Sequence, residues 1–192
     1  MPAGKEKIEI LSGTKKNAIL LLLSSVCLFI FAATPAFALK ADVAALCFSP
    51  GGGCTNVVVK EIGRARRDIR VAAYDFTSWP IARALAGAKK RGVDVRIVFD
   101  SQNAGSLYSM VNFLRKSGIP VYADVRVQLM HDKVMVMDGR TVITGSFNWT
   151  RAAELYNAEN LLVIRSRKLA GLYLENWHYL AGQSVRLAGP FQ

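Results

Sequence analysis

Histidine and cysteine are scarce in this chain of 192 residues, which contains two histidines and three cysteines. Two histidines without a tight cluster of carboxylates offer little for zinc, so we expect neither a metal site nor a cofactor. Neither Cys47 nor Cys54 has a histidine near it in the sequence, which argues against a cysteine nucleophile. The sequence also lacks internal repeats, low-complexity tracts and a convincing linker.

Acidic residues are also few, with 14 Asp and Glu against 25 Lys and Arg, and the formal net charge is +11. An excess of positive charge favours a polyanionic partner, either a nucleic acid or an anionic lipid surface, and does not choose between them. A solvated basic surface without any partner is the alternative.

Residues 1–38 have the order of a secretory signal peptide: a lysine-rich start, an apolar stretch over 18–33, and the A-x-A site Ala36-Phe37-Ala38. The apolar stretch is shorter than the roughly 20 residues that span a bilayer. We therefore expect cleavage after Ala38 and a periplasmic or secreted catalytic domain over 39–192, with no stable membrane anchoring. An uncleaved signal anchor is the alternative.

Cys47 and Cys54 are the cysteines that remain after residue 38, and a Pro-Gly-Gly-Gly turn lies between them. In an exported protein, this spacing predicts a disulfide that closes a short loop. Two free thiols are the alternative.

Apolar runs of strand length alternate with amphipathic helical stretches through the first half of the domain, and strands cluster in the second half. The pattern predicts strands over 43–48, 69–74, 95–100, 121–123, 133–137, 142–144 and 161–164. It predicts helices over 56–67, 81–91, 107–117 and 167–180. This order indicates an α/β layered domain, with a mixed β-sheet flanked by helices.

The segment from His131 to Asn148 holds the residues that indicate chemistry. His131 and Lys133 lie at the start of a Val/Met strand, and they share a face because alternate side chains of a strand point the same way. Ser146 and Asn148 share the same parity where the next strand runs out. An imidazole beside ammonium, hydroxyl and amide groups is suited to attack a phosphoryl group and to hold its negative charge.

The pattern His131-x-Lys133 with Asp138 five residues later, followed by Gly145-Ser146-x-Asn148, is identified as the signature of the phospholipase D superfamily. The chain resembles the short bacterial endonucleases of that superfamily that carry a single motif. The resemblance covers nearly all of the chain after residue 40, through segments 48–50, 72–77, 88–95, 117–120 and 157–160.

The resemblance implies a role for each motif residue. His131 would be the nucleophile, Lys133 and Asn148 would bind phosphate oxygens, and Ser146 would add a hydrogen bond. Glu159, in Asn157-Ala158-Glu159-Asn160, would orient the histidine, and Asp138 would be the structural acid of the motif. A salt bridge at a strand end is the role that we expect for Asp138, and for Glu159 it is the alternative.

The resemblance also implies chemistry with two histidines, one that attacks phosphorus and one that protonates the leaving oxygen. Since the chain carries a single motif, the second histidine would come from another copy in a homodimer. The other histidine of the chain, His178, lies in a helical pattern, where we expect a packing or surface residue.

We therefore expect an exported, metal-independent phosphodiesterase that cleaves DNA, or RNA, without sequence preference. A phospholipid hydrolase is the first alternative, and a non-catalytic nucleic-acid-binding module is the second. Five basic residues are candidate contacts to the nucleic-acid backbone: Lys89, Lys90, Arg91, Arg126 and Arg151. The first three end a predicted helix, so they could instead complement its dipole.

Overall fold

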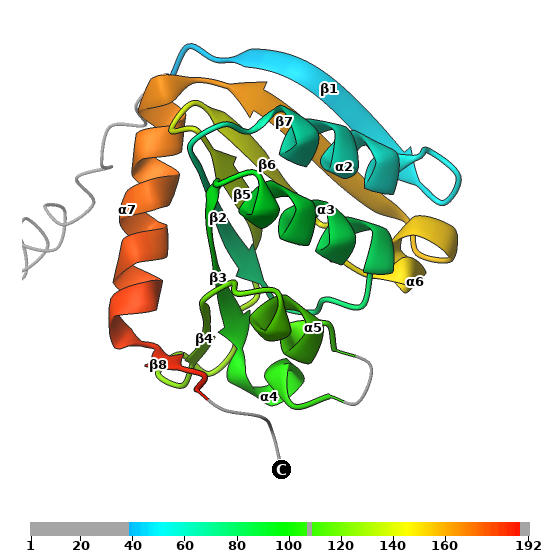
Figure 1. Ribbon diagram of the computed structural model, residues 1–192. Coiled ribbons are helices and arrows are strands. Elements are labelled where there is room, and N and C mark those ends of the chain that lie inside the picture. The colour runs from blue at the N-terminus through cyan, green and yellow to red at the C-terminus, as the bar shows by residue number, and fades with distance from the viewer. Residues whose placement is uncertain (1–38, 107–108, 189–192) are drawn as a thin grey trace, which may run out of the picture. The chain divides into compact units, whose positions relative to one another are not determined.

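Eight strands form one mixed sheet in the order β1-β7-β6-β5-β2-β3-β4-β8. The computed structural model describes residues 39–106 and 109–188, so the predicted signal peptide over 1–38 lies outside the described residues. In chain order the strands are β1 (Asp42–Ser49), β2 (Asp68–Ala73), β3 (Asp94–Asp100), β4 (Val121–Asp124), β5 (Lys133–Met137), β6 (Thr141–Gly145), β7 (Glu159–Arg165) and β8 (Val185–Arg186) (Figure 1).

The sheet is parallel in one half and antiparallel in the other. Strands β2, β3 and β4 pair in parallel, whereas β5, β6, β7 and β1 pair antiparallel, as does β8 with β4. Parallel neighbours need a crossover connection. Helices supply it: α3 (Trp79–Lys90) joins β2 to β3, and α4 (Ser101–Ala104) and α5 (Val111–Lys116) lie between β3 and β4. The predicted α/β class with a mixed sheet is confirmed.

Helices cover both faces of the sheet. Figure 1 shows α7 (Arg167–Gln183) on one side and α2 (Cys54–Arg64) together with α3 on the other. Alternation along β5 divides its side chains accordingly: Met135 and Met137 belong to the core beneath α2 and α3, whereas Val134 and Val136 pack with Trp177 of α7. By the same alternation, Lys133 belongs to the face that α2 and α3 cover.

All four predicted helices have different bounds in the structure, and two of them show why. Instead of one helix over 107–117, α5 begins at Val111, and α4 is a separate turn that the Asp100 carboxylate caps by accepting from the backbone N–H groups of Gln102 and Asn103. Residues 107 and 108 lie outside the described residues. The helix predicted over 56–67 is α2, which ends at Arg64, and the backbone N–H groups of Arg66 and Arg67 donate to Asp138 instead.

Three short elements were not predicted: α4, α6 (Arg151–Leu155) and β8. All three are too short to show a hydrophobic period. No helix in the described part of the chain is both long enough and apolar enough to cross a membrane.

A disulfide joins Cys47 near the end of β1 to Cys54 at the start of α2, with 5.6 Å between the two Cα atoms. Both cysteines are buried. The predicted disulfide is confirmed, and it fastens an edge strand of the sheet to the helix that covers it.

Candidate active site

The motif residues gather at one edge of the sheet because four strands, β2, β5, β6 and β7, begin or end there. Lys133, the first residue of β5, pairs with Ala73 at the end of β2, and Gly145, the last residue of β6, pairs with Leu161 near the start of β7. We call this the motif edge, and define it by the five residues His131, Lys133, Ser146, Asn148 and Glu159. The structure therefore brings the predicted site residues to one edge, although 28 positions separate the first from the last.

The side chains of Lys133 and His131 both contact the ring of Tyr74, the residue that follows β2. The Lys133 side chain is buried, with 7% of the residue exposed, whereas His131 is exposed. The ammonium nitrogen of Lys133 lies 4.8 Å from the centre of the Tyr74 ring, and the His131 ring meets the same ring edge-on at 4.4 Å. The motif did not predict Tyr74, because its contact with these residues depends on the pairing of β2 with β5.

Burial dominates the electrostatics of Lys133. Its ammonium donates a hydrogen bond of 2.6 Å to the backbone carbonyl oxygen of His131, and no ion pair to a carboxylate is found for it within 39–106 and 109–188. Burial lowers the pKa of Lys133, and the charges of Asp132, Glu159 and Asp75 oppose this in decreasing order. Lys133 is thus a cation at the bottom of the site with no carboxylate bound to it.

Asp75 lies beside the same cation. Burial raises the pKa of Asp75, and the Phe76 backbone N–H and the charge of Lys133 oppose the increase. Perturbed pKa values in neighbouring groups are typical of functional sites, although structural networks cause them too. In the described residues, no three His, Cys, Asp or Glu side chains are grouped so that they could hold a metal ion.

Ser146 is held at the end of β6 by Asn160. Its hydroxyl oxygen accepts from the backbone N–H of Asn160 at 3.1 Å and from the side-chain amide at 3.3 Å, which leaves the hydroxyl proton available for donation. Gly145 has a φ of 152°, and a β-carbon there would overlap the carbonyl oxygen of Asn160. Glycine is therefore required for β6 to approach β7 closely enough to place Ser146.

Asn148 carries an unsatisfied polar atom. Its Oδ1 is buried and has no hydrogen-bond partner, and it is the single buried side-chain nitrogen or oxygen of this kind in the described residues. The next residue, Trp149, fixes the backbone here, since its indole N–H donates to the Ala72 carbonyl at 3.2 Å and its carbonyl accepts from two backbone N–H groups. Phe147 and Trp149 are both buried, so neither is available to stack on a base.

Glu159 reaches the motif edge as the first residue of β7. Its Oε1 accepts from the side-chain amide of Asn157 at 3.1 Å, and no hydrogen bond to His131 is found among the described residues. Its charge acts on Lys133. The predicted role in orienting the histidine stays a prediction.

Asp138 lies away from this site, just after the other end of β5, about 17 Å along the chain direction from Lys133. Its carboxylate accepts from the backbone N–H groups of Arg66 at 3.1 Å and Arg67 at 2.8 Å, and more weakly from that of Asp68. Burial would raise the pKa of Asp138, but these three hydrogen bonds outweigh it and the pKa is lowered. The carboxylate joins the β5–β6 turn to the segment between α2 and β2.

The five candidate backbone contacts divide between the two ends of the sheet. Lys89 and Lys90 end α3 and Arg91 caps it, at the end of the sheet opposite to the motif edge, where the Arg91 guanidinium donates to the Ile62 carbonyl of α2 at 3.0 Å. Complementing the helix dipole is therefore the better account of these three residues. Arg126 follows β4 and Arg151 begins α6, so both are at the end of the sheet that carries the motif edge.

His178 lies on α7 and is exposed, with its ring edge-on to the buried Trp177 at 5.3 Å. Helix α7 covers the face of the sheet opposite to that of Lys133. Asn176 of the same helix donates to the Asp132 carboxylate at 3.3 Å, but no contact between His178 and a residue of the motif edge is found within the described chain.

Comparison with known proteins agrees with this geometry. Residues 58–180 match the sequence family described as cardiolipin synthase, PLD-like domain. The chain belongs to the phospholipase D superfamily. Members of this superfamily are phosphodiesterases, which is the chemistry that the motif indicates.

Two proteins are similar in sequence to this phospholipase D family member, to different extents. The chain is 42% identical to a phospholipase D of Rickettsia felis over 131 residues, 68% of this chain and 66% of that protein. It is 34% identical to the mitochondrial cardiolipin hydrolase of Xenopus tropicalis over 117 residues, 61% of this chain and 56% of that protein. The chain thus spans less than two thirds of the length of each of these relatives.

The crystal structure of Nuc, a phospholipase D family member from Salmonella typhimurium, superimposes with a TM-score of 0.74 at 40% sequence identity. The superposition covers 78% of this chain and 100% of that structure. The entire Nuc fold therefore has a counterpart in this phospholipase D family member.

Proposed function

We propose that this phospholipase D family member is an exported, metal-independent endonuclease that cleaves DNA or RNA without sequence preference. The observation that carries the proposal is the buried ammonium of Lys133, which has no carboxylate partner among the described residues and contacts the same Tyr74 ring as the exposed imidazole of His131. A buried cation is costly unless an anion pairs with it. A phosphodiester at the motif edge would supply that anion.

The reaction would proceed in two displacements. A nitrogen of His131 attacks phosphorus, a P–N bond forms, and the P–O bond to the leaving group breaks as that oxygen takes a proton from a second imidazole. Water then attacks the phosphohistidine, gives its proton to the second imidazole and releases His131. Lys133, Asn148 and Ser146 would hold the non-bridging oxygens as negative charge develops on them.

The second imidazole would be His131 of another copy in a homodimer. Support for this comes from the single motif of the chain and from the exposure of His131 at the sheet edge. A two-fold axis through the scissile phosphate would place one copy of the site on each side of it. His178 is a poorer candidate because α7 packs on the other face of the sheet.

Nucleic acid is the first choice of substrate because of the net charge of +11 and the two arginines, Arg126 and Arg151, at the motif end of the sheet. A phospholipid hydrolase is the second candidate. One observation favours it: the segment after β4 exposes Val125, Val127 and Leu129, which a lipid surface could cover. A non-catalytic binding module has no need of an imidazole beside a buried lysine.

The test is one assay of the purified protein in EDTA against plasmid DNA, RNA and phospholipid vesicles. Because binding to a polyanion releases counterions, nuclease activity at low substrate should fall steeply between low and physiological salt. Hydrolysis of a neutral phosphatidylcholine bilayer should show little salt dependence. Release of a lipid head group without cleavage of DNA or RNA at low salt would replace the first choice with the second.

A further inference from the structure

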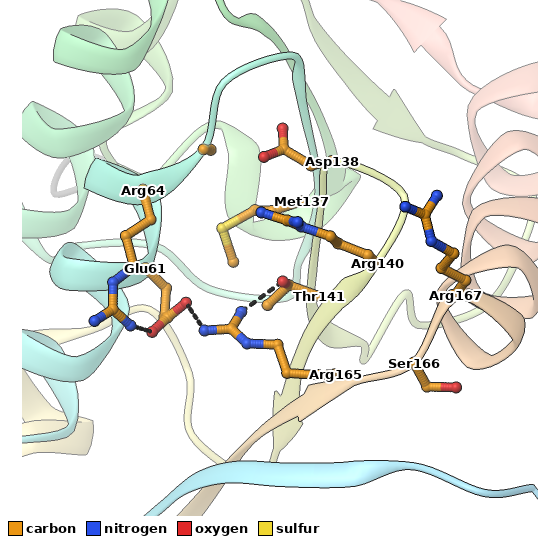
Figure 2. A pocket seen from close by; sticks show the side chains of 10 residues that line it. Glu61, Arg64, Met137, Asp138, Arg140, Thr141, Arg165, Ser166 and Arg167 are labelled. Carbon is orange, nitrogen blue, oxygen red and sulfur yellow. Dashed lines mark hydrogen bonds and ion pairs between the residues drawn. The ribbon is translucent and has the colours of Figure 1, made fainter.

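A pocket of about 520 Å³ opens at the end of the sheet opposite to the motif edge (Figure 2). Four arginines from four segments line it: Arg64 at the end of α2, Arg140 in the β5–β6 turn, Arg165 at the end of β7 and Arg167 at the start of α7. We call it the arginine pocket. No motif residue other than Asp138 lines it.

Glu61 holds two of these guanidinium groups in place. Its carboxylate is buried, with 5% of the residue exposed, and it accepts from Arg64 Nη1 at 2.6 Å and from Arg165 Nη2 at 2.6 Å. Arg165 also donates to the Thr141 hydroxyl (Figure 2). One carboxylate thus positions two cations, so it leaves a positive charge uncompensated.

Arg140 and Arg167 are less restrained. Both are exposed, and no ion pair or side-chain hydrogen bond is found for either in the described ranges. Figure 2 shows the Arg140 side chain extended over the space between Arg64 and Arg167. Asp138, the other carboxylate of the pocket, already accepts three backbone N–H groups.

The balance of charges in the arginine pocket favours a ligand with two negative charges. Four arginines face two carboxylates, so two positive charges are in surplus. A phosphate monoester carries about −1.5 to −2 at pH 7, whereas a phosphodiester carries one negative charge. The fork of N–H groups on a guanidinium matches phosphate oxygens in bidentate fashion.

The start of α7 adds to this field. The 17-residue helix begins at Arg167 on the rim of the pocket, where the helix dipole is positive. A concave space of this size also exceeds a single phosphate ion, so it leaves room for a group attached to the phosphate.

We infer that the arginine pocket binds a phosphate monoester, either the free ion or the phosphate of a nucleotide, at a site separate from the motif edge. Arg140 and Arg167 close on the phosphate oxygens, while Glu61 keeps Arg64 and Arg165 oriented beneath them. The inference does not depend on which phosphodiester is cleaved at the motif edge.

Isothermal titration calorimetry of the full chain with inorganic phosphate, and then with adenosine monophosphate, tests the inference. The titrations use a Lys133→Ala background, so that phosphate does not bind the motif edge. In that background we expect one phosphate-binding site per chain. The double variant Arg140→Ala with Arg167→Ala should lower the affinity of that site for phosphate about tenfold or more. Tighter binding of the nucleotide than of phosphate would identify the nucleotide as the ligand, and equal binding would identify the ion.

The matched control is Lys89→Ala with Lys90→Ala, which removes the same charge near the same end of the sheet. The lysine double variant should change the affinity for phosphate less than about twofold, if the arginine double variant acts through the pocket and not through the net charge of the protein. Equal binding by the arginine and lysine double variants, or no saturable binding in the Lys133→Ala background, would overturn the inference. Neither result bears on the proposed nuclease activity, which is measured with Lys133 intact.

Discussion

The ammonium nitrogen of Lys133 lies 2.6 Å from the backbone carbonyl oxygen of His131, two residues earlier in the chain. A protonated lysine has three N–H donors, and this bond uses one of them. The Tyr74 ring lies beside the same nitrogen at 4.8 Å and accepts no full hydrogen bond. The lysine is therefore oriented by the backbone of His131, the nucleophile that we propose, and its other two N–H donors remain for a phosphate.

Lys133→Met should separate activity from stability. We expect hydrolysis to fall about 100-fold or more, as it does when other enzymes lose an oxyanion donor. The melting temperature should rise by about 2 to 4 °C, because a buried cation without a carboxylate is replaced by an apolar side chain of similar length. Calorimetry and initial rates check the two effects, and a variant that is both less active and less stable would contradict this account of Lys133.

The burial of Lys133 also predicts how the stability of the fold depends on pH. Since the pKa of Lys133 is lowered in the folded chain, the unfolded chain binds more protons between that value and the ordinary 10.5. The wild-type protein should gain stability as the pH rises through this window, and Lys133→Met should not. Phosphate binding at the motif edge should weaken over the same range, because the lysine loses its charge.

His131→Ala should abolish hydrolysis and leave the fold and the affinity for DNA nearly unchanged, since the nucleophile supplies the reaction path and little of the binding. Rates and filter-binding measurements at low salt check this. The matched control is His178→Ala, which removes an exposed imidazole on α7 and should keep the wild-type rate. Substantial turnover by purified His131→Ala would remove the histidine from the proposed role.

A mixed dimer tests whether two chains share one site. Chains of wild type and His131→Ala, with different tags, should form a heterodimer of severely reduced activity if each reaction needs both imidazoles. Half of the wild-type activity in that heterodimer, or full activity of a monomer at the assay concentration, would refute the shared site. In the wild-type dimer one imidazole attacks while the other donates a proton, so the rate should have a bell-shaped pH profile that belongs to the pair.

Asp138→Asn should destabilise the fold by about 2 kcal/mol at pH 7, because hydrogen bonds to a charged acceptor are replaced by weaker ones. Asparagine tolerates the left-handed backbone of this residue, whose φ is 54°, so backbone strain does not enter the comparison. The lowered pKa of Asp138 stabilises the wild type above the ordinary value of 3.8, and this contribution disappears as the pH falls through the folded value. Urea unfolding should show that the free energies of unfolding of the wild type and Asp138→Asn differ less at pH 3 than at pH 7. An equal difference at both pH values would contradict this account of Asp138.

Sequence patterns predicted the part of the motif edge whose residues lie close together in the sequence. Strand β5 has the predicted bounds over 133–137, and β6 follows it after a short turn, so most of the motif assembles without distant contacts. Tyr74 could not be predicted, because its ring reaches His131 only when β2 pairs with β5. Lys89 and Lys90 were grouped with Arg126 by charge alone, and the direction of α3 separates them. The arginine pocket draws on four segments, and no pattern along the chain indicates it.

The contact between Gly145 and the Asn160 carbonyl has a consequence for variation among related sequences. Position 145 must be glycine because β6 and β7 lie too close together for a β-carbon there. Position 146 must be serine only because the reaction that we propose uses its hydroxyl group. A library in which 145 and 146 are randomised, and which is selected for folding alone, should return glycine at 145 and a mixture of residues at 146. Invariance at two adjacent positions would then have two different origins, one in the geometry of the sheet and one in catalysis.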